Sequence, residues 1–272
     1  MLENYEPVHA KKALAQYEYF AKKFIDEEII VPVSHNTLFM VKEYSGNYYQ
    51  KLYLNQIGKT ELSKRPDDAN CYYCKQFHTG KRKDINKRSD IKLGNTIENR
   101  FLEIINELFI SKNSSSLCVR ADQENLHNPD LKIINKETNE DILYFEFKVI
   151  FRPFVKISEY VSESFLCYNH SLTLDLENGK KLLEQRKLVE EISKSTPVVY
   201  LYFYDIPCIK GFFWMESKDV YQIMDAQSPY NRHIVDGDFN NLGQKNSATK
   251  KIYLSLTQMK DFDSFMKIAL NE

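Results

Sequence analysis

The spacing of apolar residues predicts that helices and strands alternate from about residue 94 to the end of the chain. The segment 93–109 repeats apolar residues at the three- and four-residue spacing of one helix face, and Asn95 or Thr96 is its expected N-cap. The apolar residues of this face are Ile97, Phe101, Ile104, Ile105 and Leu108. We therefore expect a helix over 93–109, followed by a Ser- and Asn-rich break at 111–116.

Short runs of β-branched, aromatic and aliphatic residues predict strands after this helix. The expected strands are LCVRA (117–121), DLKII (130–134), ILYFEFKVI (142–150), VVYLYFYD (198–205) and KGFFWM (210–215). Helices are expected at about 176–193 and 257–270. This order of elements predicts an α/β fold in which a central mixed β-sheet is flanked by helices.

The first 93 residues are expected to form an additional N-terminal region. Helical spacing predicts a helix over 7–28, EEIIVPV (27–33) predicts a short strand, and 36–60 fits either strands or a helix. Residues 61–93 are polar, with seven Lys or Arg against two Asp between Lys75 and Lys92. Such a segment is typical of a linker or a surface excursion, so we expect a boundary between 1–93 and a domain at 94–272.

Composition is that of a globular protein. The 272 residues carry a formal net charge of −1, with 28% charged and 13% aromatic residues. A polyanionic partner would therefore need a local basic patch. The five cysteines are odd in number and mostly scattered, unlike a secreted disulfide framework. Without a signal-peptide pattern or an apolar run of about 18 residues, a soluble cytoplasmic protein is expected.

One predicted strand carries charged residues where a buried strand would be apolar. In YFEFKV (144–149), Glu146 and Lys148 point to one face of the strand and the residues between them to the other. An exposed face on an edge strand, where lysine guards against aggregation, would explain this pattern. A functional site would explain it as well.

Pairing with the preceding strand brings a second carboxylate to this face. If the connecting turn centres between Thr138 and Asn139, Asp130 lies opposite Phe147, or opposite Glu146 after a shift of half a residue. Two converging carboxylates, with the carbonyl oxygen of Phe147, form a hard-oxygen site suited to Mg²⁺. Beside that ion, the Lys148 ammonium would orient an attacking water or stabilise charge on a phosphate.

The segment NPDLKIINKETNEDILYFEFKV (128–149) resembles the signature of the PD-(D/E)XK nuclease superfamily. The resemblance implies that Asp130 and Glu146 bind metal and that Lys148 is the catalytic lysine. The superfamily often adds a glutamate from the preceding helix, for which Glu98 is the candidate and Glu103 the alternative.

The order of predicted elements over 94–215 also matches this superfamily, so a restriction-endonuclease-like core is expected. A single chain with a separate N-terminal region looks most like a type II restriction endonuclease. Such an enzyme, part of a restriction-modification system in a prokaryotic cytoplasm, would cut specific double-stranded DNA sequences with Mg²⁺. A homodimer would match its twofold axis to a palindrome.

Two alternatives remain open. Some repair and recombination nucleases of the superfamily carry a glutamine on the helix after the catalytic strand, and Gln185 lies there, although no lysine or tyrosine follows at the expected spacing. These enzymes recognise DNA structure. The second alternative is a non-catalytic DNA-binding module that keeps the fold.

Other candidate sites lie outside the hairpin. Cys71, Cys74 and His78 form C-x₂-C-x₃-H, three potential zinc ligands without a nearby fourth, or else unpaired thiols. The candidate DNA-contacting residues come from a basic cluster and from a polar segment at 230–251. They are Lys81, Arg82, Lys83, Arg88, Arg232, His233, Asn240 and Lys245.

Overall fold

The computed structural model describes the parts of the chain that contain most of the predicted core. These are residues 15–17, 19, 20, 23, 87–122, 124, 125, 127–150, 172–175, 179–206, 209–226, 230–232, 249–254 and 259–272. The expected strand at 27–33 and the segments 36–60 and 61–86 lie outside them. Within the described part of the chain, no helix is long and apolar enough to cross a membrane.

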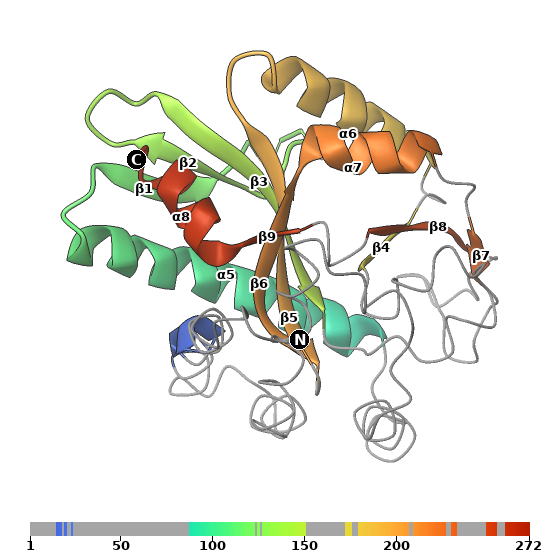
Figure 1. The fold of residues 1–272 in the computed structure, drawn as a ribbon, viewed down its shortest axis with the longest axis horizontal. Helices are drawn as coiled ribbons and strands as arrows, with labels where there is room; N and C mark the ends of the chain where they lie inside the picture. The colour runs from blue at the N-terminus through green and yellow to red at the C-terminus, as the bar shows by residue number, and fades with distance from the viewer. Residues whose placement is uncertain are drawn as a thin grey trace, which may run out of the picture.

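A mixed six-stranded sheet forms the centre of the fold (Figure 1). Its strands are β1 (Ser116–Arg120), β2 (Leu131–Asn135), β3 (Asp141–Ile150), β5 (Val198–Ile206), β6 (Ile209–Glu216) and β9 (Lys260–Asp261). They lie in the order β1-β2-β3-β5-β6-β9, and only β3 and β5 run parallel. The parallel pair fits the connection between these strands, which contains α6 (Gly179–Ile192).

Helices cover the two faces of this sheet. On one face α5 (Lys87–Ser111) packs against β1 and β3, and α8 (Phe262–Ala269) packs against β3 and β6. On the other face α7 (Ser217–Ala226) packs against β5 and β6, with α6 beside it (Figure 1). The expected α/β architecture, a mixed sheet flanked by helices, is confirmed.

A second, three-stranded sheet was not expected from the sequence. It contains β4 (Leu172–Asp175), β8 (Thr249–Leu254) and β7 (Tyr230–Arg232), in the order β4-β8-β7. Sequence patterns also missed α7, which directly follows β6, and the two-residue strand β9. The final helix is shorter than expected, because Asp261 caps it by accepting a hydrogen bond from the Ser264 backbone amide at 2.8 Å.

The aromatic core lies between the sheet and the α5–α8 layer. Phe101 of α5 stacks on Phe147 of β3 with ring centroids 4.5 Å apart, and Phe145 meets Phe265 of α8 edge to face. Phe20 packs against both Phe101 and Phe212. Rings from five separate segments therefore pack together and hold α5 against β3.

Helix α5 begins earlier than the sequence predicted. It starts at Lys87, so Asn95 and Thr96 lie inside the helix and the prediction that one of them is its N-cap is wrong. The boundary expected between residues 93 and 94 consequently falls within α5. In addition, Tyr17 and Phe20, from the expected helix at 7–28, are helical and buried in the same core as α5.

Strand β3 alternates as expected. Leu143, Phe145 and Phe147 are buried toward α5 and α8, whereas Glu146 and Lys148 are on the other face. The strand lies between β2 and β5, so the explanation of its charges by an exposed edge strand is wrong. Glu146 and Lys148 therefore lie on an interior strand, where charged side chains need hydrogen-bonding or ionic partners.

Candidate active site

The β2–β3 hairpin brings Asp130 to the level of Glu146. Leu131 lies opposite Phe145, and extending this register by one residue sets Asp130 opposite Glu146. Of the two pairings that the sequence left open, Asp130 with Phe147 or with Glu146, the structure therefore has the second. A register irregularity between Ile133 and Ile134 accounts for the difference from a uniform ladder.

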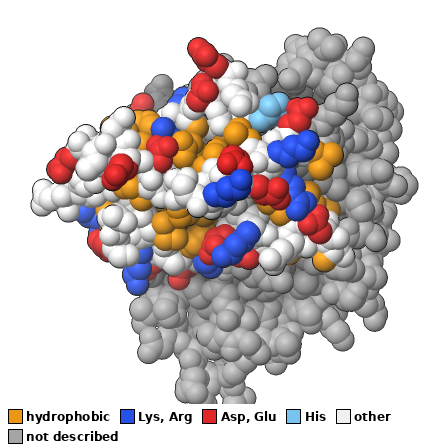
Figure 2. Space-filling view, turned by 90° about the horizontal axis from the view of Figure 1, so that it is seen from above, with side chains coloured by type: hydrophobic (Ala, Val, Ile, Leu, Met, Phe, Trp, Pro, Cys, Tyr) orange, Lys and Arg blue, Asp and Glu red, His pale blue; other side chains and the backbone are white. Residues whose placement is uncertain are grey.

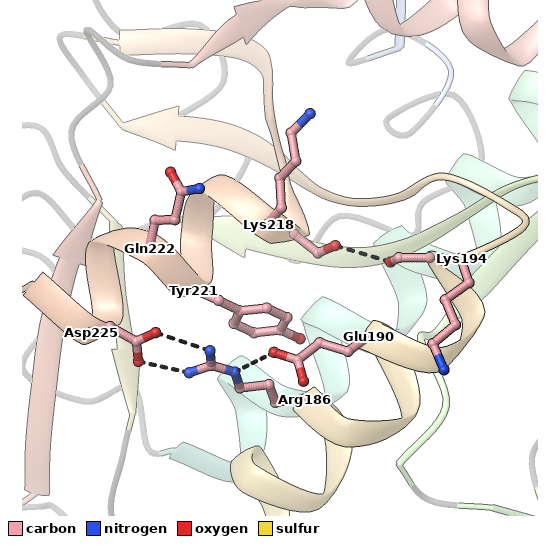
Figure 3. Close-up of a pocket in the computed structure, with 9 residues that line it drawn as sticks. Arg186, Glu190, Lys194, Lys218, Tyr221, Gln222 and Asp225 are labelled. Atoms are coloured by element: carbon pink, nitrogen blue, oxygen red, sulfur yellow. Dashed lines mark hydrogen bonds and ion pairs between the residues drawn. The ribbon is translucent and has the colours of Figure 1, made fainter.

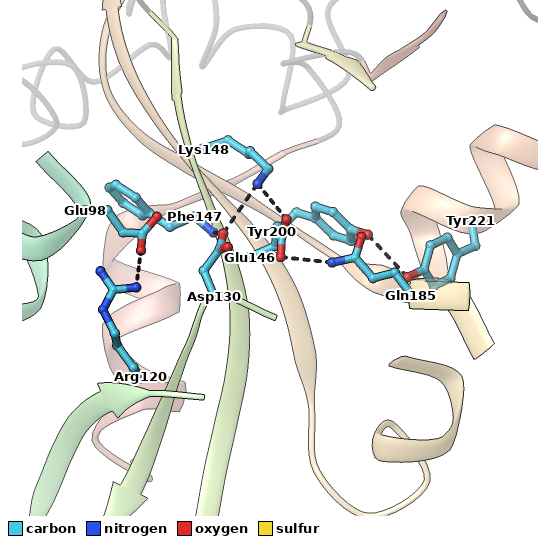
Figure 4. Close-up of polar contacts among 9 residues, drawn as sticks. All are labelled: Glu98, Arg120, Asp130, Glu146, Phe147, Lys148, Gln185, Tyr200 and Tyr221. Atoms are coloured by element: carbon cyan, nitrogen blue, oxygen red, sulfur yellow. Dashed lines mark hydrogen bonds and ion pairs between the residues drawn. The ribbon is translucent and has the colours of Figure 1, made fainter. Parts of the chain in front are cut away.

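Lys148 joins the two carboxylates (Figure 4). Its Nζ atom donates to Glu146 Oε1 at 2.6 Å and to Asp130 Oδ2 at 3.4 Å. The predicted meeting of Asp130, Glu146 and Lys148 is therefore present in the structure. Because one ammonium reaches both carboxylates, their oxygens converge on a shared position for a cation.

Pro129 explains why the Asp130 side chain binds the backbone of β3. The Phe147 amide donates to Asp130 Oδ2 at 2.9 Å. In the observed register Phe147 would lie opposite Pro129, which has no N–H to donate to the Phe147 carbonyl. The N–H and C=O groups of one residue in a strand point to the same side of that strand. The Phe147 carbonyl therefore faces Asp130, as expected for a ligand of the metal ion.

The charged side chains of Glu146 and Lys148 differ in their exposure to solvent. Glu146 is 12% exposed, whereas Lys148 is 39% exposed, so the ammonium is within reach of solvent. Burial lowers the pKa of Lys148, but the charges of Glu146 and Asp130 and their hydrogen bonds outweigh it and raise the pKa above its usual value. Lys148 is therefore a cation and a hydrogen-bond donor at neutral pH.

Gln185 of α6 holds the second oxygen of Glu146. Its Nε2 atom donates to Glu146 Oε2 at 3.1 Å, and its side chain is buried. Tyr200 of β5, beside Glu146 in the parallel ladder, has its hydroxyl 3.3 Å from that of Tyr221 on α7. Burial is the main cause that raises the pKa of both phenols, that of Tyr221 to about 12. The Glu146 carboxylate thus accepts hydrogen bonds from the Lys148 ammonium and the neutral Gln185 amide.

Sequence reasoning identified Gln185 but missed the two tyrosines. Tyr200 follows from the alternation of β5 only once β5 is known to run beside β3. Tyr221 lies on α7, a helix that was not expected. The one available signal was the aromatic alternation of VVYLYFYD, which marks Tyr200 and Tyr202 as one face.

Glu98 lies near the site but is paired with Arg120. Arg120 Nη1 donates to Glu98 Oε1 at 2.6 Å (Figure 4). The same guanidinium also donates to Asn99. Burial raises the pKa of Glu98, and so does the charge of Asp130. The alternative, Glu103, is exposed and pairs with Arg100 at 2.6 Å. Of the two, Glu98 is the one close enough to Asp130 to act in the site.

A second contact ties α6 to the segment before Asp130. His127 Nε2 lies 3.0 Å from Glu184 Oε2, one residue before Gln185. Glu184 and Gln185 thus join α6 to the segment before β2 and to β3.

The donor set fits a divalent cation with oxygen ligands. Asp130 and Glu146 supply converging carboxylates, and Phe147 directs a carbonyl to the same side. Among the described residues, His, Cys, Asp and Glu form no group of three that could hold a metal ion. Any further ligands would therefore be water, carbonyl oxygens or the substrate, as is usual for Mg²⁺.

The other predicted sites fall largely outside the described residues. Cys71, Cys74 and His78 lie there, as do Lys81, Arg82, Lys83, His233, Asn240 and Lys245. Arg88 is in the first turn of α5, and Arg232 ends β7. Cys118, the one cysteine for which the structure places a side chain, is buried and unpaired by a disulfide.

The outer face of α6 and α7 carries mixed charges. Basic and acidic side chains are interspersed over it, without a continuous basic patch (Figure 2). A pocket of about 260 Å³ lies between the two helices, where Arg186 forms two hydrogen bonds to Asp225 and one to Glu190 (Figure 3). The same guanidinium covers the Tyr221 ring at 5.0 Å. These contacts hold α6 on α7 and thereby position Gln185.

Comparisons with known proteins leave the site to be judged on its geometry. The chain matches no family model, no curated protein and no solved structure.

Proposed function

We propose that this protein is a Mg²⁺-dependent deoxyribonuclease of the PD-(D/E)XK superfamily, most like a type II restriction endonuclease. The observation that carries the proposal is the contact of Lys148 with both Asp130 and Glu146 on an interior strand. Ion pairs of this kind are costly to build into a sheet and contribute little net stability, which favours a chemical role.

The order of elements supports the same proposal. From α5 to β6 the order is a helix, a strand, the hairpin with the carboxylates, a helix and two further strands, with β4 of the second sheet inserted between the hairpin and α6. This is the order that the sequence resemblance implies for a restriction-endonuclease-like core. The bend of the chain at Asp130 and the pairing of β3 with β5 hold the charged groups at one end of β2.

Each residue then has a role that its contacts allow. Asp130, Glu146 and the Phe147 carbonyl hold Mg²⁺, which would lower the pKa of a bound water and stabilise charge on the phosphate. Lys148 donates hydrogen bonds to the attacking water or to a phosphate oxygen, because a cation cannot accept the proton of water. The water oxygen would form a bond to phosphorus as the bond from phosphorus to a sugar oxygen breaks, with the proton of the water released to solvent and the leaving sugar oxygen protonated from solvent.

The restriction type implies a homodimer acting on both strands of a specific sequence. In that proposal Arg88, Arg232 and the other candidate DNA-contacting residues bind phosphates or base edges. Residues 1–93 would help to bind DNA, and Cys71, Cys74 and His78 would bind a structural zinc ion.

One observation favours a repair or recombination nuclease with structural specificity. Gln185 contacts Glu146 directly, and the glutamine after the catalytic strand is a feature of such enzymes in the superfamily. Tyr221, from α7, supplies a buried tyrosine hydroxyl on the same side of the sheet, where the sequence of α6 offered none. The two functions differ in the DNA they recognise and share the same chemistry.

Digestion of mixed-sequence phage DNA separates these functions. The restriction proposal predicts discrete bands with Mg²⁺, none with EDTA, and bands that form about 10²- to 10³-fold more slowly with Lys148→Ala. A Mg²⁺-dependent smear, or cleavage confined to ends and junctions, would indicate the repair nuclease. A protein that binds DNA but leaves it intact under every Mg²⁺ condition would be a non-catalytic DNA-binding module and would overturn the nuclease proposal.

A further inference from the structure

Arg120 supplies a fixed positive charge beside the proposed metal site. It extends from the end of β1, and its guanidinium donates to Glu98 at 2.6 Å and to Asn99. Strand β1 is itself held by Asn106 of α5, whose side chain bonds both the amide and the carbonyl of Cys118, at 2.7 and 2.9 Å. The guanidinium therefore occupies a defined position between α5 and the hairpin.

The positive charge of Arg120 stabilises the ionised form of the Glu98 carboxylate. Its side chain is only 14% exposed, while Arg120 is 36% exposed and reaches solvent. A carboxylate so buried is costly to ionise without a partner, and Asp130 adds a like charge nearby. Arg120 contacts the Glu98 carboxylate and Lys148 contacts Asp130, so each of these neighbouring carboxylates has a cation beside it.

The local charge count bears on how many metal ions the site can take. Glu98, Asp130 and Glu146 carry three negative charges, and Lys148 and Arg120 carry two positive charges. These five side chains together carry one net negative charge. That charge suits one divalent cation, whereas two such cations would leave a strongly positive site. In two-metal nuclease sites the ions lie about 3.5–4 Å apart and need carboxylates on both sides.

We infer that Arg120 takes the place of a second metal ion, so that the site binds a single divalent cation between Asp130 and Glu146. Glu98 would be the ligand of the second ion, but the Arg120 guanidinium already neutralises it. This inference rests on the proposed function, because it concerns the metal content of the same site.

Mn²⁺ is a suitable probe, since free Mn²⁺ is counted directly by electron paramagnetic resonance in a titration of the full chain. We expect the wild-type protein to bind one ion and Arg120→Ala to bind two, because the freed Glu98 carboxylate can join Asp130. Arg120→Lys keeps the charge and should bind one. Arg120→Ala combined with Glu98→Gln removes the extra ligand and should also return to one. Arg120→Gln repeats the test if the alanine variant does not fold.

The outcomes separate this inference from the proposed function. Two ions in the wild type, or one in both Arg120→Ala and Arg120→Gln, would overturn the inference. If those variants bind one ion but lose DNA affinity, Arg120 is a phosphate contact instead. One ion in the wild type and two in Arg120→Ala, with no DNA cleavage, would support the inference and count against the nuclease. No bound Mn²⁺ in any variant would overturn both.

Discussion

The Lys148 ammonium lies 2.6 Å from the Glu146 carboxylate on the same face of one interior strand, two residues apart. Alternation along the strand places both side chains together, and Asp130 completes the group from the paired strand.

Removing the lysine should separate metal binding from catalysis. Lys148→Ala deletes the donor for the water or phosphate oxygen and should slow cleavage by about 10²- to 10³-fold. It also removes a positive charge beside the carboxylates, so the apparent affinity for Mg²⁺ should rise. Cleavage rates over a Mg²⁺ titration measure both effects. Lys132→Ala is the control, since Lys132 of β2 pairs with Asp141 of β3 and its loss should leave both values unchanged.

Loss of the Gln185 contact should destabilise the protein. Gln185→Leu removes the hydrogen bond that Gln185 donates to the nearly buried Glu146 carboxylate, which should cost about 1–3 kcal/mol of unfolding free energy. Urea unfolding with EDTA measures this, and Mg²⁺ should restore part of it. Lys187→Ala, at an exposed position of α6, should stay within about 0.5 kcal/mol of wild type. Equal stability of Gln185→Leu and wild type would contradict the account of Glu146.

The stacked rings behind the site should matter more than any surface residue. Phe101 is fully buried and stacks on Phe147, so Phe101→Ala should cost about 3–5 kcal/mol of unfolding free energy. Ile110, on the same helix but 69% exposed, provides the control, and Ile110→Ala should change stability by less than about 0.5 kcal/mol. Thermal or urea unfolding compares the two.

Glu98 should give a measurable pH dependence. Burial and the charge of Asp130 raise its pKa in the folded state above the unfolded value, so the folded protein holds this proton more tightly. Its contribution to stability is therefore present below the unfolded pKa and is lost as pH rises through the folded pKa. Relative to Glu98→Gln, the wild type should lose stability over that window when unfolding is measured in EDTA. A difference that is constant or grows with pH would contradict this assignment.

The sequence predicted the sheet, the flanking helices and the hairpin because alternation and helical spacing are local signals. Asp130, Glu146 and Lys148 followed because a single turn connects their strands. Tyr200 and Tyr221 depend on the parallel pairing of β3 with β5 and on α7, which are tertiary features. The pairing of Glu98 with Arg120 links residues 22 positions apart through the packing of α5 on β1, and no local pattern marks it.

The most direct test is the initial rate of plasmid cleavage by Glu146→Gln in Mg²⁺. Glu146 contacts both Lys148 and Gln185 and is the carboxylate on which the proposed site depends. Glu140→Gln, at an exposed position before β3, is the matched control. We predict Mg²⁺-dependent cleavage by the wild type and by Glu140→Gln, and none above background by Glu146→Gln. Equal cleavage by all three proteins would contradict a nuclease site at Glu146.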